Sequence, residues 1–398
     1  MALADGTDAL AERAARLLVG GGQGHKRRSE IPGYPQFAVR GKGCRFWDDQ
    51  EREFIDYLCA YGPILLGYAH PVVDAAVKRQ MDQGVIFDVG HPSEIELAEK
   101  LVELLPCAEM VSFFTGGSGA TTGAVRVARS YTGREKVVRL GYHGWHDWCR
   151  TGDRGVPECL GPLTLGFGYN DLESLERIFA ENPGQIACVI MEAAVTVPPV
   201  PGFLEGVKQV CHENGTLCIF DEVKTGFRYA YGGAHEYYGV TPDLATFGKA
   251  MANGYDIGVL AGKREILSAC GDVWLAATFH AHLTGIAATL ATIGEMKAID
   301  GISLIWRQGR KLIDGLNEIV QKLGVDARCC GDPPMPQLKF GEGGDRVGRL
   351  FWEGAAKRGV YFHPGHPWFV STAHDDQVIE LTLRVAGEAM SEACQNAV

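Results

Sequence analysis

Residues that could do chemistry recur directly after short apolar runs of this sequence. In an open parallel sheet, ligands bind beyond the carboxyl ends of the strands, so residues at those positions are expected to meet at one edge. A glycine-rich segment, an aromatic residue, two acidic positions and a lysine follow five such runs: Gly116-Gly117-Ser118-Gly119, Tyr142-His143, Glu192, Asp221-Glu222 and Lys249.

The glycine-rich segment predicts an anion-binding loop. It lies between an expected strand, residues 110–114, and an expected helix, residues 120–131. Glycines let backbone N–H groups approach an anion at a helix N-terminus, where the helix dipole favours negative charge, and Ser118 can add a hydrogen bond. The glycine spacing is neither that of a dinucleotide-binding fold nor that of a P-loop. Taken alone, the segment could equally be a structural turn.

Asp221 and Lys249 each follow a mostly apolar run, TLCIF and LATFG. A carboxylate at a buried strand end needs a partner, and a cationic ring nitrogen would be one. A helix N-cap or an ion pair with Arg228 would be others. A lysine in a partly buried site has a lowered pKa and can attack a carbonyl carbon, although a lone lysine is more commonly a surface residue.

The remaining polar residues narrow the chemistry. Tyr142 could stack on a planar ring or could belong to the core. His143, His146 and Asp147 form no complete ligand set, so no metal site is predicted, and no Ser-His-Asp triad can be placed. A phosphate loop, a stacking aromatic, a carboxylate for a pyridinium nitrogen and a lysine together predict pyridoxal phosphate as the cofactor.

The elements that must position these residues are expected to form an α/β domain in residues 67–290. Helical stretches alternate there with short apolar runs, as in a mostly parallel sheet that helices cover on both faces. The expected strands are residues 110–114, 136–140, 187–191, 217–220, 244–247 and 258–261.

Residues 1–66 and 291–398 are expected to join in a smaller α+β domain. The N-terminal segment predicts an amphipathic helix, residues 7–19, and a short antiparallel sheet within residues 36–59, with turns at Gly41 and Asp48-Asp49. Long helices are expected at residues 303–323, 345–358 and 376–393.

Composition excludes several classes of protein. With 46% hydrophobic and 22% charged residues among 398, the chain resembles a globular enzyme, and its net charge of −11 argues against nucleic acid as a partner. Residues 273–294 lack charged side chains, but their histidines and threonines predict a buried loop and a core helix, not a membrane span. Twelve cysteines without a CxxC pair, and a start without an apolar signal segment, indicate the cytoplasm.

Four longer segments resemble a known family. They are GGSGATTGAVRVARSYTGREKVVRLGYHGWHD, VIMEAAVTVPPVPGFLEGVKQVCHENGTLCIFDEVKTGFR, PDLATFGKAMANGYDIGVLAGKREI and WFVSTAHDDQVIELTL. These segments are similar to class III aminotransferases of fold type I, and most closely to the glutamate-1-semialdehyde 2,1-aminomutase branch. The resemblance covers nearly the whole chain.

The resemblance implies a role for each matched position. Lys249 would form the internal aldimine and Asp221 would pair with the pyridine nitrogen. The other cofactor-binding positions would be Gly117 and Ser118 at the phosphate, Val223 and Tyr142 at the ring, and Glu192 near it. Thr278 would reach the phosphate of the partner subunit, which implies a homodimer with active sites at the interface. Arg28, or else Arg27, and Tyr61 would contact the substrate, although the two arginines could simply be solvated.

The implied activity is the transfer of an amino group between an amino acid or amine and a keto acid. An intramolecular aminomutase, or a racemase or epimerase, would share the same cofactor residues, whereas a silent binding homologue or a nicotinamide dehydrogenase fits them less well. The chain departs from the family pattern at Gly119, which replaces a glutamate, at Ala193, which replaces a proline, and at His280-Ala281-His282, which replace Gly-Asn-Pro. These departures are expected around the substrate pocket, so the sequence does not identify the substrate.

Overall fold

The computed structural model describes residues 7–22, 31–269, 271 and 273–397. The chain forms two compact units, one of residues 1–70 with 303–398 and one of residues 71–302. The sequence predicts boundaries at 66 and 290, whereas these units divide after residues 70 and 302, and the division into two domains stays a prediction.

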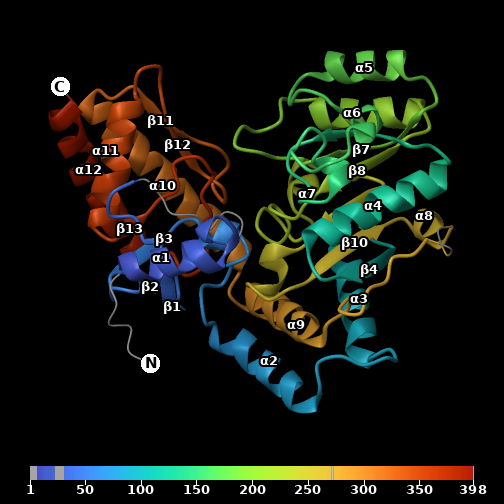
Figure 1. Ribbon diagram of the computed structural model, residues 1–398, viewed down its shortest axis with the longest axis horizontal. Coiled ribbons are helices and arrows are strands. Elements are labelled where there is room, and N and C mark those ends of the chain that lie inside the picture. The colour runs from blue at the N-terminus through green and yellow to red at the C-terminus, as the bar shows by residue number, and fades with distance from the viewer. Residues whose placement is uncertain (1–6, 23–30, 270, 272, 398) are drawn as a thin grey trace. The chain divides into compact units, whose positions relative to one another are not determined.

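The second unit contains a seven-stranded sheet with the order β4-β10-β9-β8-β7-β5-β6. Figure 1 labels β4, β10, β8 and β7 of this sheet. β10 runs antiparallel to its neighbours β4 and β9, and the other neighbouring pairs are parallel. The strands are β4 (Met110–Phe114), β5 (Lys136–Leu140), β6 (Thr164–Gly166), β7 (Ile186–Met191), β8 (Leu217–Asp221), β9 (Leu244–Phe247) and β10 (Gly258–Gly262).

These strands form where apolar residues predominate, although β4 contains Ser112 and β5 contains Arg139. All six residues of β7 and all four of β9 are buried, as expected of strands that helices cover on both faces. Six of the seven strands are therefore predicted from the sequence to within a residue at each end. β6 has only three residues and carries no comparable apolar run.

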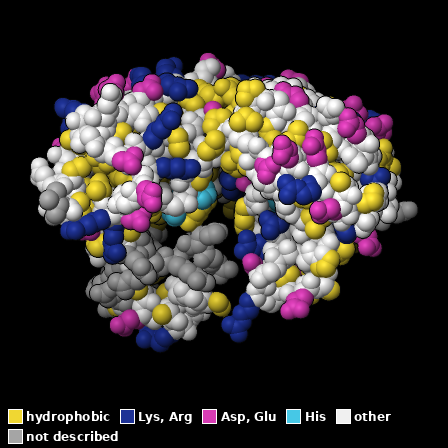
Figure 2. Space-filling model, turned by 90° about the horizontal axis from the view of Figure 1, so that it is seen from above, with side chains coloured by type: hydrophobic (Ala, Val, Ile, Leu, Met, Phe, Trp, Pro, Cys, Tyr) yellow, Lys and Arg dark blue, Asp and Glu magenta, His cyan; other side chains and the backbone are white. Residues whose placement is uncertain are grey.

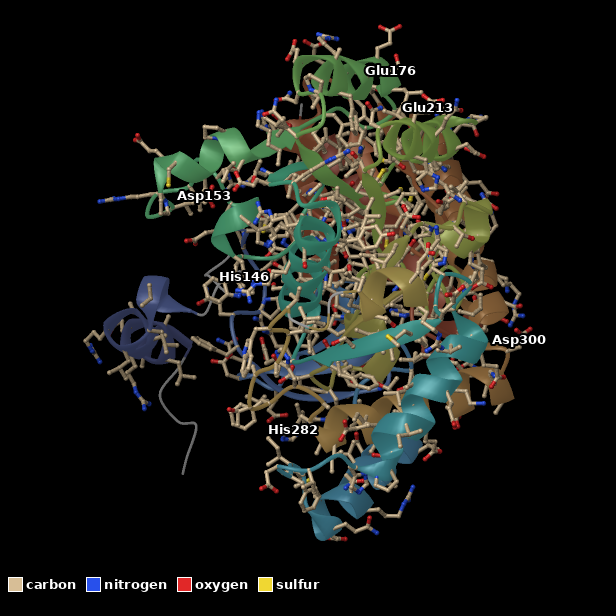
Figure 3. All side chains as sticks on the ribbon, turned by 90° about the vertical axis from the view of Figure 1, so that its right-hand side faces the viewer. His146, Asp153, Glu176, Glu213, His282 and Asp300 are labelled. Atoms are coloured by element: carbon tan, nitrogen blue, oxygen red, sulfur yellow. The ribbon has the colours of Figure 1, made fainter. Side chains whose placement is uncertain are left out.

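Helices flank this sheet and present polar faces outward. Glu176 of α5 and Glu213 of α6 lie on the outer surface (Figure 3), while Ala120, Ala124 and Ala128 of α4 are fully buried. Small side chains let a helix lie close to a sheet, so α4 can place its N-terminus near the strand ends. The helices are α2 (Pro71–Gln83), α3 (Pro92–Leu104), α4 (Gly117–Thr132), α5 (Leu172–Glu181), α6 (Phe203–Glu213), α7 (Ala234–Tyr238), α8 (Arg264–Ser268) and α9 (Leu283–Ala298), with 3-10 turns η3 (Asp147–Cys149), η4 (Glu158–Leu163) and η5 (Lys249–Ala252).

The first unit combines both ends of the chain. Its four-stranded sheet has the order β1-β2-β3-β13, and the last strand, from the C-terminal part, pairs in parallel with β3. The predicted long helices are present within a few residues of their expected bounds. The elements are α1 (Thr7–Leu17), η1 (Val19–Gly21), β1 (Ala38–Lys42), β2 (Arg45–Asp48), β3 (Glu53–Asp56), η2 (Cys59–Tyr61), α10 (Gly301–Leu323), β11 (Ala327–Cys330), β12 (Gln337–Phe340), α11 (Asp345–Lys357), β13 (Val360–Tyr361) and α12 (Asp376–Ala397).

The predicted turn at Gly41 is wrong. Gly41 lies within β1 and pairs with Phe46, and the turn falls at Gly43, whose φ is +59°. Glycine is needed at position 41 for a different reason, since a Cβ there would lie 2.7 Å from the ring of Tyr68.

The predicted buried loop before α9 is also wrong, although α9 itself is a core helix. Trp274 is 76% exposed and Phe279 is 58% exposed, whereas Val273 and Leu275 are partly buried against the core. No helix in the described part of the chain has the length and hydropathy needed to cross a bilayer. On the face shown in Figure 2, basic and acidic side chains are interspersed.

Candidate active site

The parallel strands bring the predicted residues to one edge of the sheet. Tyr142 follows β5, Glu192 follows β7, Asp221 ends β8 and Lys249 follows β9 directly after Gly248. These four strands are consecutive neighbours in the order β9-β8-β7-β5, so their carboxyl ends lie side by side. The glycine-rich loop after β4 leads into α4, whose N-terminus contacts the same region through Val223.

Asp221 is 3% exposed and is held from both sides. Its Oδ2 accepts a hydrogen bond from His143 Nδ1 at 2.7 Å, and its Oδ1 accepts from the Val223 N–H at 3.1 Å and from Thr246 Oγ1 at 3.2 Å. A carboxylate offers roughly four acceptor positions, so three bonds leave one for a further donor. This arrangement orients the carboxylate and preserves its capacity to bind a protonated ring nitrogen.

His143 is the partner that sequence reasoning missed. The sequence suggested it only as an improbable metal ligand, yet it is 3% exposed and its ring lies parallel to that of Trp148 at 6.1 Å. Its Nε2 is buried without a hydrogen-bond partner among the described residues. The available signal was its position, because it follows β5 at the same edge as Asp221.

Lys249 opens η5 with a left-handed backbone, φ +46°. Such a conformation costs a non-glycine residue about 1–2 kcal/mol and is typical of functional sites. Burial, followed by the charge of Lys224, lowers the pKa of Lys249 to about 8 against the opposing effect of Glu192 and Asp221. A lysine with this pKa is partly uncharged near neutral pH and can act as a nucleophile.

Glu192 and Lys224 form an ion pair beside Lys249. Glu192 is 5% exposed, and its second oxygen accepts a hydrogen bond from the Tyr142 N–H at 3.2 Å. The Tyr142 side chain itself is 48% exposed, which excludes the alternative that it packs in the core. Lys224 was not singled out from the sequence, although it directly follows the matched Asp-Glu-Val motif.

The start of α4 leaves its first backbone N–H groups without a side-chain cap. A Cβ on Gly117 would lie 2.8 Å from Val223 Cγ1, and a Cβ on Gly144 would overlap Ser118 Oγ. Side chains at these glycines would therefore fill the space in front of the loop. Uncapped N–H groups at a helix N-terminus, beside glycines that have no side chain, can bind a phosphate.

The other predicted residues belong to other parts of the chain. Thr278 is exposed in the loop that precedes α9. Tyr61 belongs to the first unit, where the centroid of its ring lies 5.8 Å from that of His363 and 5.1 Å from that of His366. Its role toward a substrate stays a prediction. Arg27 and Arg28 lie outside the described residues.

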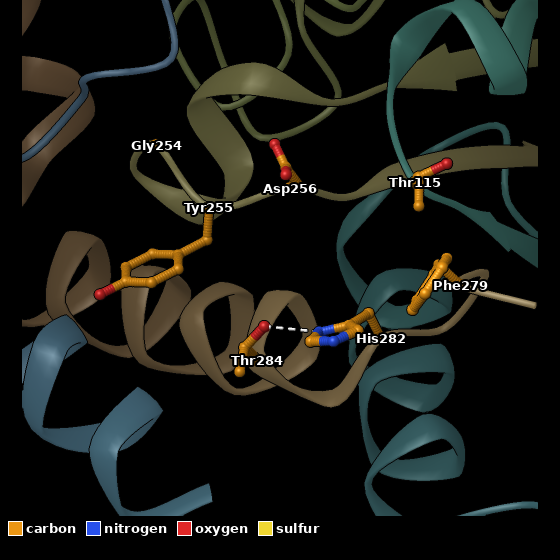
Figure 4. A pocket seen from close by; sticks show the side chains of 7 residues that line it. All are labelled: Thr115, Gly254, Tyr255, Asp256, Phe279, His282 and Thr284. Carbon is orange, nitrogen blue, oxygen red and sulfur yellow. Dashed lines mark hydrogen bonds between the residues drawn. The ribbon is translucent and has the colours of Figure 1, made fainter. Parts of the chain in front are cut away.

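A cavity of about 450 Å³ opens near the glycine-rich loop (Figure 4). One of its residues, His282, departs from the family pattern and bonds through Nδ1 to Thr284 Oγ1 at 2.7 Å. The cavity is lined by Thr115, Gly254, Tyr255, Asp256, Phe279, His282 and Thr284.

The residues present fit pyridoxal phosphate. The uncapped start of α4 suits the phosphate, the remaining acceptor position of Asp221 suits the ring nitrogen, and the buried amine of Lys249 suits the aldehyde. Val223 lies between the start of α4 and Asp221, since it contacts Gly117 and donates its N–H to Asp221.

Comparison with known proteins agrees with this geometry. Residues 28–380 match the family model for class III aminotransferases. The chain is 38% identical to a 3-aminobutyryl-CoA aminotransferase of Cloacimonas acidaminovorans, with 96% of each chain covered. It is 37% identical to a glutamate-1-semialdehyde 2,1-aminomutase of Methanothermobacter thermautotrophicus, with 97% of this chain and 99% of the relative covered.

A solved structure shows the same fold along the whole chain. The pyridoxal phosphate internal aldimine form of FumI from Sphingopyxis sp. MTA144 superposes with a TM-score of 0.94 at 31% identity, with 98% of this chain and 96% of that chain covered. The chain therefore belongs to the class III aminotransferases. This membership confirms the predicted fold type, the predicted class of enzyme, a transaminase, and the predicted cofactor, pyridoxal phosphate.

Proposed function

We propose that this protein transfers an amino group between an amine-bearing substrate and a keto acid, with pyridoxal phosphate bound covalently to Lys249. The observation that carries the proposal is the buried Lys249 amine, with its lowered pKa, at the sheet edge where Asp221 is held by His143.

Each part of the cofactor has a matching group in the protein. The N–H groups that begin α4 and the Ser118 hydroxyl would hold the phosphate, and Asp221 would keep the ring nitrogen protonated. Val223, whose side chain contacts Gly117, would pack on one face of the ring, and the exposed Tyr142 ring would cover the other. When bound, the cofactor supplies an electron sink for the carbanion formed at the substrate carbon.

Lys249 Nζ is the group that moves the proton. It is partly uncharged near neutral pH, so it can accept a proton from the amine-bearing carbon of the substrate and later return one. A base with a pKa of about 8 is well matched to this task, because the best catalytic pKa lies near the working pH. His143 acts indirectly, since it orients Asp221.

We propose that the donor is a β-amino compound or a terminal amine. One relative at 38% identity is described as acting on 3-aminobutyryl-CoA, and another at 37% on glutamate-1-semialdehyde. Neither compound carries its amine on the carbon next to a free carboxylate. A panel of β-amino acids, their acyl thioesters, terminal amines and α-amino acids, each with pyruvate and 2-oxoglutarate, would test this choice. Preference for α-amino acids would contradict it.

We further propose a homodimer. The loop residues Phe87 and Val89 are 50% and 71% exposed, and residues of the same loop line a pocket with His280 and Ala281, next to the exposed Phe279. Clustered exposed apolar side chains of this kind are typical of subunit interfaces. A second copy that covered them would approach Thr278, the residue expected to reach a neighbouring phosphate. Light scattering of the purified chain would measure the assembly.

The location that we propose is the cytoplasm. The described cysteines are free thiols, and most of them are buried among apolar residues, as is common in a reducing compartment.

An aminomutase is the alternative function, and the 37% identity with a glutamate-1-semialdehyde 2,1-aminomutase favours it over a racemase. The two functions differ in one requirement. A transaminase needs a second keto substrate for multiple turnovers, whereas an aminomutase returns the amino group to the same molecule. Turnover of a single substrate without an added keto acid would support the aminomutase.

The site itself is tested by the attachment of the cofactor. Borohydride should fix pyridoxal phosphate on Lys249, and peptide mass spectrometry should find it there. Fixation on another lysine, or normal amino transfer by Lys249→Ala, would refute the assignment.

A further inference from the structure

Two acids and two lysines meet at this site, and each acid already has a partner. Asp221 bonds to His143 at 2.7 Å, and Glu192 forms an ion pair with Lys224. Lys249 has neither a hydrogen bond nor an ion pair through Nζ with the residues that the structure describes, although the charges of both acids act on it. The positive charge that balances Glu192 therefore comes from Lys224.

Glu192 needs such a partner because its side chain is only 6% exposed. An isolated buried carboxylate is strongly destabilised, so it recruits whichever cation is available. The Tyr142 N–H, at 3.2 Å from Oε2, supplies one hydrogen bond but no full charge. Two ammonium groups are near enough to act on or bind this carboxylate, those of Lys224 and Lys249.

An ion pair between Glu192 and Lys249 would oppose the chemistry. It would hold Lys249 as an ammonium ion, which is not a nucleophile, and would orient it toward the acid. Lys224 is 15% exposed in its side chain and already occupies Oε1 of Glu192. Its own positive charge also disfavours a second charge on Lys249.

We propose that Lys224 is a positioning residue that sequesters Glu192, so that Lys249 stays free of an acidic partner and reactive toward the cofactor aldehyde. The proposal rests on the proposed function, because it concerns the lysine that binds pyridoxal phosphate. It assigns a role to a residue outside the matched cofactor positions. It also explains why a buried acid can lie beside Lys249 without holding it as an ammonium ion.

The pH profile of Lys249 tests the proposal without relying on enzymatic activity. The full-length chain is freed of cofactor, labelled with acetic anhydride over a range of pH, and the modification of Lys249 is measured by peptide mass spectrometry. In Lys224→Met, Glu192 has lost its partner and can pair with Lys249. The pH at the midpoint of Lys249 labelling should therefore rise by about one unit, and the labelling rate at neutral pH should fall roughly tenfold. The groups that face Lys249 and are kept constant in this comparison are Asp221 and Arg228.

A double variant separates sequestration from a general structural role. Glu192→Gln removes the competing acid, so Lys224→Met with Glu192→Gln should recover most of the lost reactivity of Lys249. Lys224→Arg should keep the wild-type profile, and Lys322→Met, at an exposed position of α10, is the control for loss of one charge. The rate at which added pyridoxal phosphate develops visible absorption should follow the same order among the variants.

Two results would overturn the inference: an unchanged Lys249 profile in Lys224→Met, or a double variant that is no more reactive than the single one. If borohydride fixed the cofactor on a different lysine, the proposed function would fail instead. The two failures are distinguishable because the labelling profile is measured without cofactor.

Discussion

Replacement of His143 by Phe tests whether the hydrogen bond from His143 to Asp221 contributes to cofactor binding. Phe keeps an aromatic ring next to Trp148, whose centroid lies 6.1 Å from that of His143, but removes the donor to Asp221. Gln is the matched control, because its amide can still donate a hydrogen bond to the carboxylate.

The expected magnitude follows from the 2.7 Å bond between His143 Nδ1 and Asp221 Oδ2. A hydrogen bond to a charged group contributes about 1.5–3 kcal/mol. If about 2 kcal/mol of that energy serves to hold the carboxylate for the ring nitrogen, the Kd for pyridoxal phosphate should rise roughly 30-fold. Folding should suffer less, because the change also removes the buried Nε2 that has no partner among the described residues.

Equilibrium titration of the cofactor-free protein, followed by visible absorption, measures the Kd, and thermal denaturation of the same samples measures stability. His143→Gln should bind the cofactor more tightly than His143→Phe. The reasoning would be refuted if His143→Phe bound pyridoxal phosphate as tightly as the wild type, or if both variants lost the same affinity.

Three other changes probe the site and its support. Lys249→Ala should slow amino transfer by roughly 10²–10⁴, because it removes the proton-moving amine; single-turnover absorbance measures this, and an unchanged rate would exclude the role. Gly144→Ala should lower the free energy of unfolding by about 1–3 kcal/mol, because φ is +107° and a Cβ would overlap Ser118 Oγ, and an unaltered urea midpoint would contradict that reason. Burial raises the pKa of Asp243, but hydrogen bonds, chiefly from Lys263, outweigh it and hold the pKa below its usual value. Its stabilising effect is therefore complete above a pH of about 3.9 and is lost as the pH falls through the folded-state pKa, so the stability gap between wild type and Asp243→Asn should shrink in acid and not stay constant.

Most of the sheet could be predicted because its strands are buried on both faces. β7 and β9 consist of buried residues throughout, and such runs are visible without any knowledge of their neighbours. β6 could not be found, since three residues give no periodicity to read. The turn at Gly41 was misplaced because a glycine can serve either a turn or a close contact, and only the packing of Tyr68 decides which.

The exposed loop before α9 was misjudged for a related reason. Its apolar side chains predict burial, but exposed apolar side chains are common on folded proteins. Trp274 and Phe279 are exposed in this unit, so the apolar character of the loop is a poor guide to its burial there.

The amino-acid sequence by itself determines which residues of this protein stand at strand ends: a glycine-rich loop, an aromatic residue, two acids and a lysine. It does so because an apolar run and the residue that follows it are local features of the chain. Only the tertiary structure decides that Asp221 is held by His143, 78 residues away, and that Glu192 is paired with Lys224. Those pairings depend on the order in which β8, β7 and β5 lie in the sheet, and strand order is set by the packing of the whole unit.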